Sequence, residues 1–264
     1  NRMLDMLKKG RDCFGVVAVK AEFEAEGTRP DELLRLMELT CRADLQLALK
    51  IGGCEAVSDL HASKLYGAGY IIAPMVETPY ALSKFVEAKN KVYGSQKGTD
   101  FLFNLETQAT LDNLDQMIPL AKVELDGIVF GRVDFTCSRG LERKQINDRQ
   151  ITDAVLKVAN ACTTHDLELV VGGSVALEAA DALREIRSVR LDRFETRKIV
   201  FDGAVAEQRS FEAAIANAVA FELAWLENKR DHYTAIAKED ESRIRMIQER
   251  NAAAMREKIT SVAA

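Results

Sequence analysis

The sequence has little that would connect it to a membrane or to nucleic acid. It contains no run of about 18 apolar residues, the length that a membrane-spanning helix needs. It has no signal-like segment at its start. The formal net charge is -5, and no basic stretch interleaved with aromatic residues occurs. We therefore expect a cytoplasmic protein with neither a nucleic-acid partner nor a membrane partner.

Cysteine and histidine are also scarce. The five cysteines are scattered, odd in number and without the spacing of a metal site, which indicates reduced, mostly structural thiols. The three histidines fall in or at the ends of predicted helices and show neither catalytic-triad spacing nor metal-ligand spacing. We expect them at the surface, so chemistry in this protein has to come from other side chains.

Strands and helices alternate along most of the chain. The 264 residues are 47% hydrophobic and 29% charged, enough for one large α/β core. Short apolar runs separated by helices with 3.6-residue periodicity indicate βαβ units and a parallel sheet. Seven strands are predicted, one fewer than a closed (β/α)8 barrel needs, and an open doubly wound sheet stays possible on this pattern alone. The predicted strands are 14–24, 45–51, 69–76, 100–106, 127–134, 167–171 and 194–201.

The last sixty residues differ in character from the rest. Residues 210–237 form one predicted helix, and residues 239–259 form another that is more charged and richer in alanine. The second helix is too polar for a core, so it contacts a partner subunit or remains a solvated tail. We expect a barrel domain over residues 1–204 and C-terminal helices over residues 205–264 that make an oligomer contact.

Two predicted strands end on carboxylates. The strand 100–106 finishes on Glu106, and the strand 127–134 finishes on Asp134. The C-terminal ends of parallel barrel strands are where such enzymes keep their active sites. Two carboxylates suit Mg²⁺ or Mn²⁺, which takes oxygen ligands and often keeps only one or two from the protein. The alternative is that both residues are helix N-caps or solvated acids.

The first predicted strand carries Lys20, Glu22 and Glu24 on one face, because side chains alternate along a strand. Three charges on one face indicate an opening onto the active site or a position at the barrel rim. Glu22 or Glu24 is then a candidate general base, or a residue that orients a water molecule. A structural ion pair with Lys20 or Lys50 is an equally good interpretation.

Lys50 ends the strand 45–51 and is a candidate catalytic and substrate-binding residue. Its ammonium group suits a substrate carboxylate or an enolate oxygen. The alternatives are a Schiff base, a lysine that reaches the surface and a lysine paired with an acid. Arg132, two residues before Asp134, is a candidate for binding a second anionic group or for pairing with an acid such as Glu106. The other candidates are Glu77 and Gly131 for substrate binding, Asn104 as a donor in the cavity, and the turn 172–174 as an anion site or a plain turn.

Four segments together resemble the HpcH/HpaI aldolase and citrate lyase β-subunit superfamily. They are Lys50-Ile51-Gly52-Gly53, the run 69–78 around Ala73-Pro74-Met75, Asn104-Leu105-Glu106-Thr107, and the run 126–135 that contains Gly131-Arg132-Val133-Asp134. The resemblance covers residues 15–203 in the family's order. It implies a (β/α)8 TIM barrel, usually oligomeric, often with a C-terminal helix swapped between subunits. It places the family's metal-binding residues on Glu106 and Asp134.

The sequence departs from the aldolase branch at two places. Lys50 stands where that branch has an arginine that binds the substrate, and Glu24-Ala25-Glu26-Gly27 stands where it has Glu-His-Gly. The resemblance still implies a metal-dependent carbon–carbon lyase or aldolase that acts through a metal-bound enolate of pyruvate or a related 2-oxo acid. An acyl-CoA lyase of the citrate lyase β type is one alternative. A non-catalytic barrel that binds a metabolite or a partner is the other.

Overall fold

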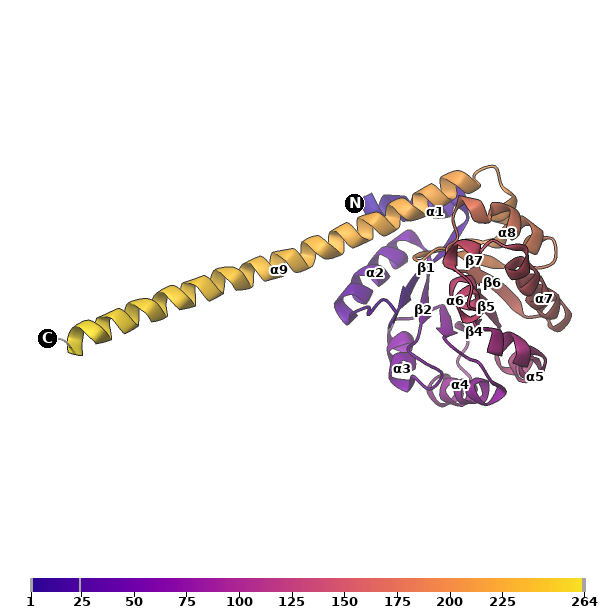
Figure 1. Ribbon diagram of the computed structural model, residues 1–264, viewed down its shortest axis with the longest axis horizontal. Helices are drawn as coiled ribbons and strands as arrows, with labels where there is room; N and C mark the ends of the chain where they lie inside the picture. The colour runs from indigo at the N-terminus through magenta and orange to yellow at the C-terminus, as the bar shows by residue number, and fades with distance from the viewer. Residues whose placement is uncertain (1, 24, 263–264) are drawn as a thin grey trace. The chain divides into compact units, whose positions relative to one another are not determined.

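The structure, a computed structural model, describes residues 2–23 and 25–262, with side chains up to residue 256. Eight strands form a closed barrel in the order β1-β2-β3-β4-β5-β6-β7-β8, and helices surround it (Figure 1). The predicted α/β barrel is therefore confirmed, and the open sheet is excluded. The strands are β1 Val16–Glu22, β2 Gln46–Lys50, β3 Tyr70–Ala73, β4 Asp100–Leu105, β5 Gly127–Gly131, β6 Glu168–Gly172, β7 Arg193–Glu195 and β8 Ile199–Asp202.

The helices begin where the sequence supplies start signals. Pro30 and Pro79 occupy first turns, and the Thr78 hydroxyl accepts the backbone N–H of Ala81 at 3.1 Å. The described part of the chain also contains three short 3₁₀ segments: η1 Arg143–Gln145, η2 Leu177–Ala179 and η3 Gly203–Glu207. The α-helices are α1 Arg2–Phe14, α2 Pro30–Ala43, α3 Val57–Leu65, α4 Pro79–Tyr93, α5 Gln108–Glu124, α6 Arg132–Ser138, α7 Arg149–His165, α8 Ala180–Arg187 and α9 Phe211–Val262.

The eighth strand comes from a hairpin that the sequence did not predict. The single predicted strand 194–201 is divided into β7 and β8 by a turn in which the Thr196 N–H donates to the Ile199 carbonyl at 2.9 Å. Strand β8 consequently runs antiparallel to both β7 and β1, so the sheet is not entirely parallel as expected. A three-residue connection can only reverse the chain, since a parallel neighbour needs a crossover of a dozen residues or more.

The barrel interior is layered by the alternation of side chains along each strand. One layer is entirely apolar and buried: Ala18, Ala48, Ile72, Leu102, Val129, Val170 and Val200. The side chains two residues further along the parallel strands are mostly polar or small: Lys20, Lys50, Asn104, Gly131 and Gly172. The apolar layer is therefore the floor beneath a polar mouth at the C-terminal ends of these strands.

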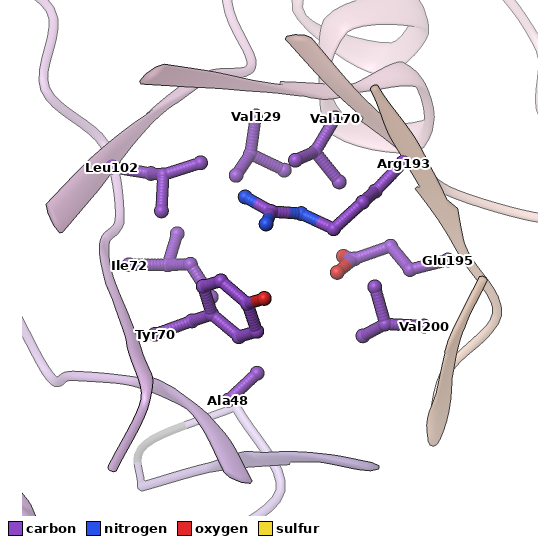
Figure 2. Close-up of a pocket in the computed structure, with 9 residues that line it drawn as sticks. All are labelled: Ala48, Tyr70, Ile72, Leu102, Val129, Val170, Arg193, Glu195 and Val200. Carbon is purple, nitrogen blue, oxygen red and sulfur yellow. The ribbon is translucent and has the colours of Figure 1, made fainter. Parts of the chain in front are cut away.

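A small cavity of about 10 Å³ lies in the barrel interior (Figure 2). Tyr70, Arg193 and Glu195 are its polar lining residues. The Arg193 guanidinium lies 4.1 Å from the centre of the Tyr70 ring and is paired with Glu168. An arginine that is both stacked and ion-paired can be buried at acceptable energetic cost. Tyr70, Glu168 and Arg193 each begin a strand, so together they close the N-terminal end of the barrel.

We expect Asp100→Asn to stabilise the protein at neutral pH. Burial raises the pKa of Asp100 above its ordinary value, Asp126 raises it further, and Arg193 opposes the shift. A carboxyl group whose pKa is higher in the folded state than in the unfolded state lowers the free energy of unfolding when it ionises. This destabilisation grows as the pH rises above the ordinary pKa. The amide removes this destabilisation, and a gain of up to about 0.5 kcal/mol is the scale for such a partly exposed site.

Thermal or urea unfolding at pH 7 and at pH 3 measures this effect. The advantage of Asp100→Asn should be present at pH 7 and should shrink at pH 3, below the ordinary aspartate pKa of 3.8, where the native carboxyl is also neutral. Asp115→Asn, on the exposed face of α5, is the matched control. Equal shifts for the two variants, or a larger advantage at pH 3, would contradict the prediction.

The chain divides into two compact units, residues 1–222 and residues 223–264. Helix α9 spans this boundary as one helix, so the prediction of two separate helices is wrong. Ala237, Lys238 and Glu239 at the predicted break are all good helix formers, and no glycine or proline interrupts them. Among the described residues, no helix combines the length and the apolar character that a membrane crossing requires. The division at residues 204 and 205 and the oligomer contact stay predictions.

Candidate active site

A cavity of about 480 Å³ opens at the C-terminal ends of the parallel strands. Seven of the predicted residues line it, although the sequence spreads them over more than a hundred positions: Lys20, Glu22, Lys50, Asn104, Glu106, Gly131 and Asp134. Among the described residues, its charged lining contains five carboxylates and four cations. They are Glu22, Glu106, Asp134, Glu195 and Glu222, with Lys20, Lys50, Arg143 and Arg197.

Glu106 follows β4 directly and is almost completely buried, with 1% of its surface exposed. Its Oε2 accepts hydrogen bonds from Asn104 Nδ2 at 2.6 Å and Lys50 Nζ at 3.3 Å, and its Oε1 accepts one from the Met75 N–H at 2.9 Å. These donors hold the carboxylate in one orientation. A Cβ at position 131 would come within 2.8 Å of the Glu106 Cβ, so Gly131 makes room for this side chain.

Asp134 lies in the first turn of α6, where a continuation of strand β5 was predicted. That expectation was wrong because β5 ends at Gly131 and the chain turns directly into a helix. Asp134 still lines the cavity. Burial raises its pKa, and the negative charge of Glu106 raises it further, against the opposing effects of Lys50 and Arg143. The two carboxylates are therefore close enough to repel each other.

The donor chemistry of this pair fits a hard divalent cation. The Asp134 carboxylate accepts no hydrogen bond within the described part of the chain, and Glu106 Oε1 has a lone pair beyond the one that Met75 uses. No group of three or more His, Cys, Asp or Glu side chains suited to a metal occurs among the described residues. A site with two carboxylates leaves the other coordination positions of a metal to water and substrate. This is typical of Mg²⁺ and Mn²⁺ and differs from a structural site in which the protein supplies every ligand.

Lys50 stands at the end of β2, and its side chain is 16% exposed. Its ammonium group pairs with Glu106 at 3.3 Å. Lys50 is therefore not a surface lysine, and it is paired with an acid, which is one of the interpretations that the sequence left open. An ammonium has three N–H groups, so Lys50 can hold Glu106 and still donate to a bound oxygen.

Lys20 and Glu22 both line the cavity, as their shared strand face predicted. Their charged groups lie 3.2 Å apart, and Lys20 also pairs with Glu195 of β7. Burial alone would raise the pKa of Glu22, but Lys20 and Lys50 outweigh it, and the net pKa lies below its ordinary value. Glu22 is thus a stable anion and a weak base. Glu24, the other candidate base, lies outside the described residues.

The structure does not bring Arg132 or Glu77 into the lining of the cavity. The Arg132 guanidinium is buried and donates to the carbonyls of Gly172 at 3.3 Å and Gly173 at 2.8 Å and to Asn147 Oδ1 at 3.0 Å. Burial lowers the pKa of Arg132 to about 10. The Arg132 donors are used by hydrogen bonds within the protein, so these hydrogen bonds do not support the predicted role of Arg132 in substrate binding.

Four charged residues among the described lining were not predicted: Glu195, Arg143, Arg197 and Glu222. Glu195 ends a strand, and the strand-end argument that found Glu106 would have found it if the hairpin had been recognised. Arg143 reaches the cavity by donating from Nε and Nη2 to the Ser174 hydroxyl at 3.2 and 2.8 Å. Glu222 lies in α9 and carries no signal in the sequence that marks it for the site.

Comparison with known proteins identifies the family. The family model described as HpcH/HpaI aldolase/citrate lyase matches residues 55–191, just over half of the chain. The chain belongs to this family. No curated protein matches it in sequence. The matched region contains Glu106, Gly131 and Asp134, so the carboxylate pair lies inside the segment that defines the membership.

Solved structures share the fold at low sequence identity. An HpcH/HpaI aldolase from Desulfitobacterium hafniense DCB-2 is 12% identical, with a TM-score of 0.58 over 82% of this chain and 88% of that one. A variant of the citrate synthase SbnG is 17% identical, with a TM-score of 0.55 over 83% and 89%. An HpcH/HpaI aldolase/citrate lyase family protein from Burkholderia cenocepacia J2315 is 12% identical, with a TM-score of 0.57 over 81% and 98%. These likenesses show the fold alone.

Proposed function

We propose that this protein is a metal-dependent carbon–carbon lyase that acts on pyruvate or a closely related 2-oxo acid through its enolate. The observation that carries the proposal is the convergence of Glu106, Asp134 and Lys50 in one cavity of a family barrel. A divalent cation, when bound by Glu106 and Asp134, would supply Lewis-acid stabilisation of the charge that develops on the 2-oxo group.

The chain's own residues provide binding and proton handling. Lys50 donates to the carboxylate or the 2-oxo oxygen of the substrate as a point charge, without the two-pronged geometry of an arginine. Asn104 and the Met75 N–H keep Glu106 fixed, so the site does not have to reorganise when charge develops. Glu22, held as an anion, accepts through a bridging water molecule the proton that leaves the carbon next to the 2-oxo group.

We expect chelation to abolish turnover. The protein is incubated with oxaloacetate, and separately with pyruvate and a panel of aldehydes, before and after treatment with EDTA. Activity should fall at least 100-fold with EDTA and return on addition of Mg²⁺ or Mn²⁺, because the carboxylate pair alone repels the anionic substrate. Turnover that is unchanged after exhaustive chelation would refute the metal-dependent proposal.

Of the two alternatives, the acyl-CoA lyase receives less support from the cavity. Lys20 and Lys50 are each paired with a carboxylate and Arg143 with Ser174, so these lining cations form no basic cluster for the phosphates of a nucleotide. The non-catalytic barrel would show no turnover with any substrate at any metal concentration. The same assay therefore separates it from the lyase.

We also propose that the protein is a homo-oligomer that associates through residues 223–264. Considered by itself, this unit is helical and carries exposed large apolar side chains, among them Leu226, Ile244 and Ile247. Long helices are rarely stable in water without packing of an apolar face. Light scattering coupled to size exclusion should give a mass above the 29.3 kDa of one chain, and a monomer at micromolar concentration would refute the proposal.

A further inference from the structure

A buried lysine lies across the barrel from the candidate cation site. Lys20 comes from β1, whereas Asp134 follows β5, four strands away in a closed barrel of eight. Lys20 is 7% exposed and lines the cavity. A molecule that fills this cavity therefore has the carboxylate pair on one side and Lys20 on the other.

Lys20 has a hydrogen-bond donor left over. Its Nζ contacts Glu195 Oε1 and lies 3.2 Å from Glu22 Oε1, which uses two of the three N–H groups of an ammonium. The described contacts give its Nζ no other protein acceptor. The third N–H is consequently available to an oxygen atom of a bound molecule.

The surroundings keep this lysine charged and in place. Burial by itself would lower the pKa of Lys20, but Glu195 and Glu22 outweigh burial and hold the pKa above its ordinary value. Gly172 makes room for Glu195, because a Cβ at position 172 would come within 2.8 Å of Glu195 Oε1. A permanent, fixed cation in a water-poor site stabilises negative charge more effectively than a mobile one.

The other cations of the cavity are engaged differently. Lys50 pairs with Glu106 on the side of the candidate cation site. Arg143 is bonded to Ser174, and Arg197 is mostly exposed and lies 3.7 Å from Glu26. Lys20 is therefore the best-placed cation for a second reactant.

We propose that the Lys20 ammonium donates to the carbonyl oxygen of the second reactant, an aldehyde, and stabilises the alkoxide on that oxygen when the carbon–carbon bond forms or breaks. This inference rests on the proposed function. In the addition direction the enolate carbon attacks the aldehyde carbon, the new bond forms, and the C=O π pair moves to oxygen. That oxygen accepts the N–H of Lys20 and takes a proton from water. Cleavage reverses each step.

Two measurements on one protein sample test the inference. The first is exchange of the methyl protons of pyruvate in D₂O, followed by NMR, which requires enolate formation but no aldehyde. The second is addition of pyruvate to glycolaldehyde. Because only folded protein catalyses exchange, the exchange rate also reports on the integrity of each variant. The deciding quantity is the ratio of the addition rate to the exchange rate.

Two variants remove the ammonium group. Lys20→Met leaves two buried carboxylates without their counter-charge, so Lys20→Met/Glu195→Gln removes a cation and an anion together. We expect the ratio to fall at least 100-fold in each, the scale for loss of one alkoxide-stabilising donor. Lys157→Met, on the exposed face of α7, is the matched control and should leave the ratio unchanged.

The outcomes distinguish the two proposals. Addition and exchange that fall in parallel in both variants, or a ratio that stays within threefold of the unmodified protein, would overturn the role of Lys20. If the unmodified protein catalyses neither exchange nor addition with Mg²⁺ or Mn²⁺ present, the proposed function itself fails. Exchange without addition in the unmodified protein, for every aldehyde of the panel, would overturn the aldehyde as second reactant.

Discussion

Glu106→Gln is expected to reduce turnover of a 2-oxo acid at least 1,000-fold while leaving the protein folded. The carboxylate is the acceptor for three donors, from Asn104, Lys50 and Met75, and the amide replaces one of its oxygens with an NH₂ group. The NH₂ group cannot ligate a cation, and it places N–H donors opposite the N–H donors that the carboxylate oxygen accepted. Loss of a cation ligand removes the electrostatic stabilisation that supplies most of the rate in such a site.

Steady-state kinetics with oxaloacetate over a range of Mg²⁺ concentrations measures this effect. A weaker cation site should also raise the Mg²⁺ concentration needed for half-maximal residual activity. Glu87→Gln replaces an exposed glutamate of α4 that pairs with Lys84, and it serves as the matched control. If the Glu106→Gln variant keeps more than a tenth of the activity and its Mg²⁺ dependence is unchanged, Glu106 is not a ligand of the cation.

Arg132→Met is expected to destabilise the protein by about 3 kcal/mol. The guanidinium is 1% exposed and satisfies the carbonyls of Gly172 and Gly173 together with Asn147 Oδ1. Methionine matches much of the volume but leaves three oxygens without donors, and hydrogen bonds to a charged group contribute about 1.5–3 kcal/mol each. Removing the buried charge recovers part of this loss, which limits the net effect.

Urea unfolding followed by circular dichroism gives the free energy of unfolding for this comparison. Arg132→Lys should be intermediate, because an ammonium reaches fewer than three of these oxygens. Arg139→Met, at the exposed end of the same helix, should change stability by less than about 0.5 kcal/mol. A stable Arg132→Met variant whose substrate KM has risen would instead restore the substrate-binding role expected from the sequence.

The barrel and half of its candidate site could be predicted because the relevant signals are local. Apolar runs with helices between them identify the parallel strands, and a carboxylate after such a run identifies Glu106 without any knowledge of its neighbours. Lys20 and Glu22 were assigned to the cavity face by the two-residue period of a strand, and both line the cavity.

The errors have a common cause in backbone geometry that residue patterns do not encode. Arg132 was expected beside Asp134 on one strand face, but β5 ends at Gly131, and the helical turn that follows turns Arg132 toward Gly172 and Gly173. The hairpin at Thr196 was missed because a charged three-residue turn without glycine or proline lacks the usual turn signal. Because the hairpin was not predicted, the position of Glu195 at the end of a strand was not predicted either.

By itself, the sequence determined the strand-and-helix order, the strand-end position of Glu106 and the shared face of Lys20 and Glu22. Only the tertiary structure decided which charges meet: Lys50 with Glu106, Lys20 with Glu195, and Arg132 with backbone carbonyls far along the chain. The reason is physical. Period and propensity are properties of neighbouring residues, whereas the pairing of buried charges depends on barrel closure, which brings β1 beside β8 and β7 within reach of Lys20.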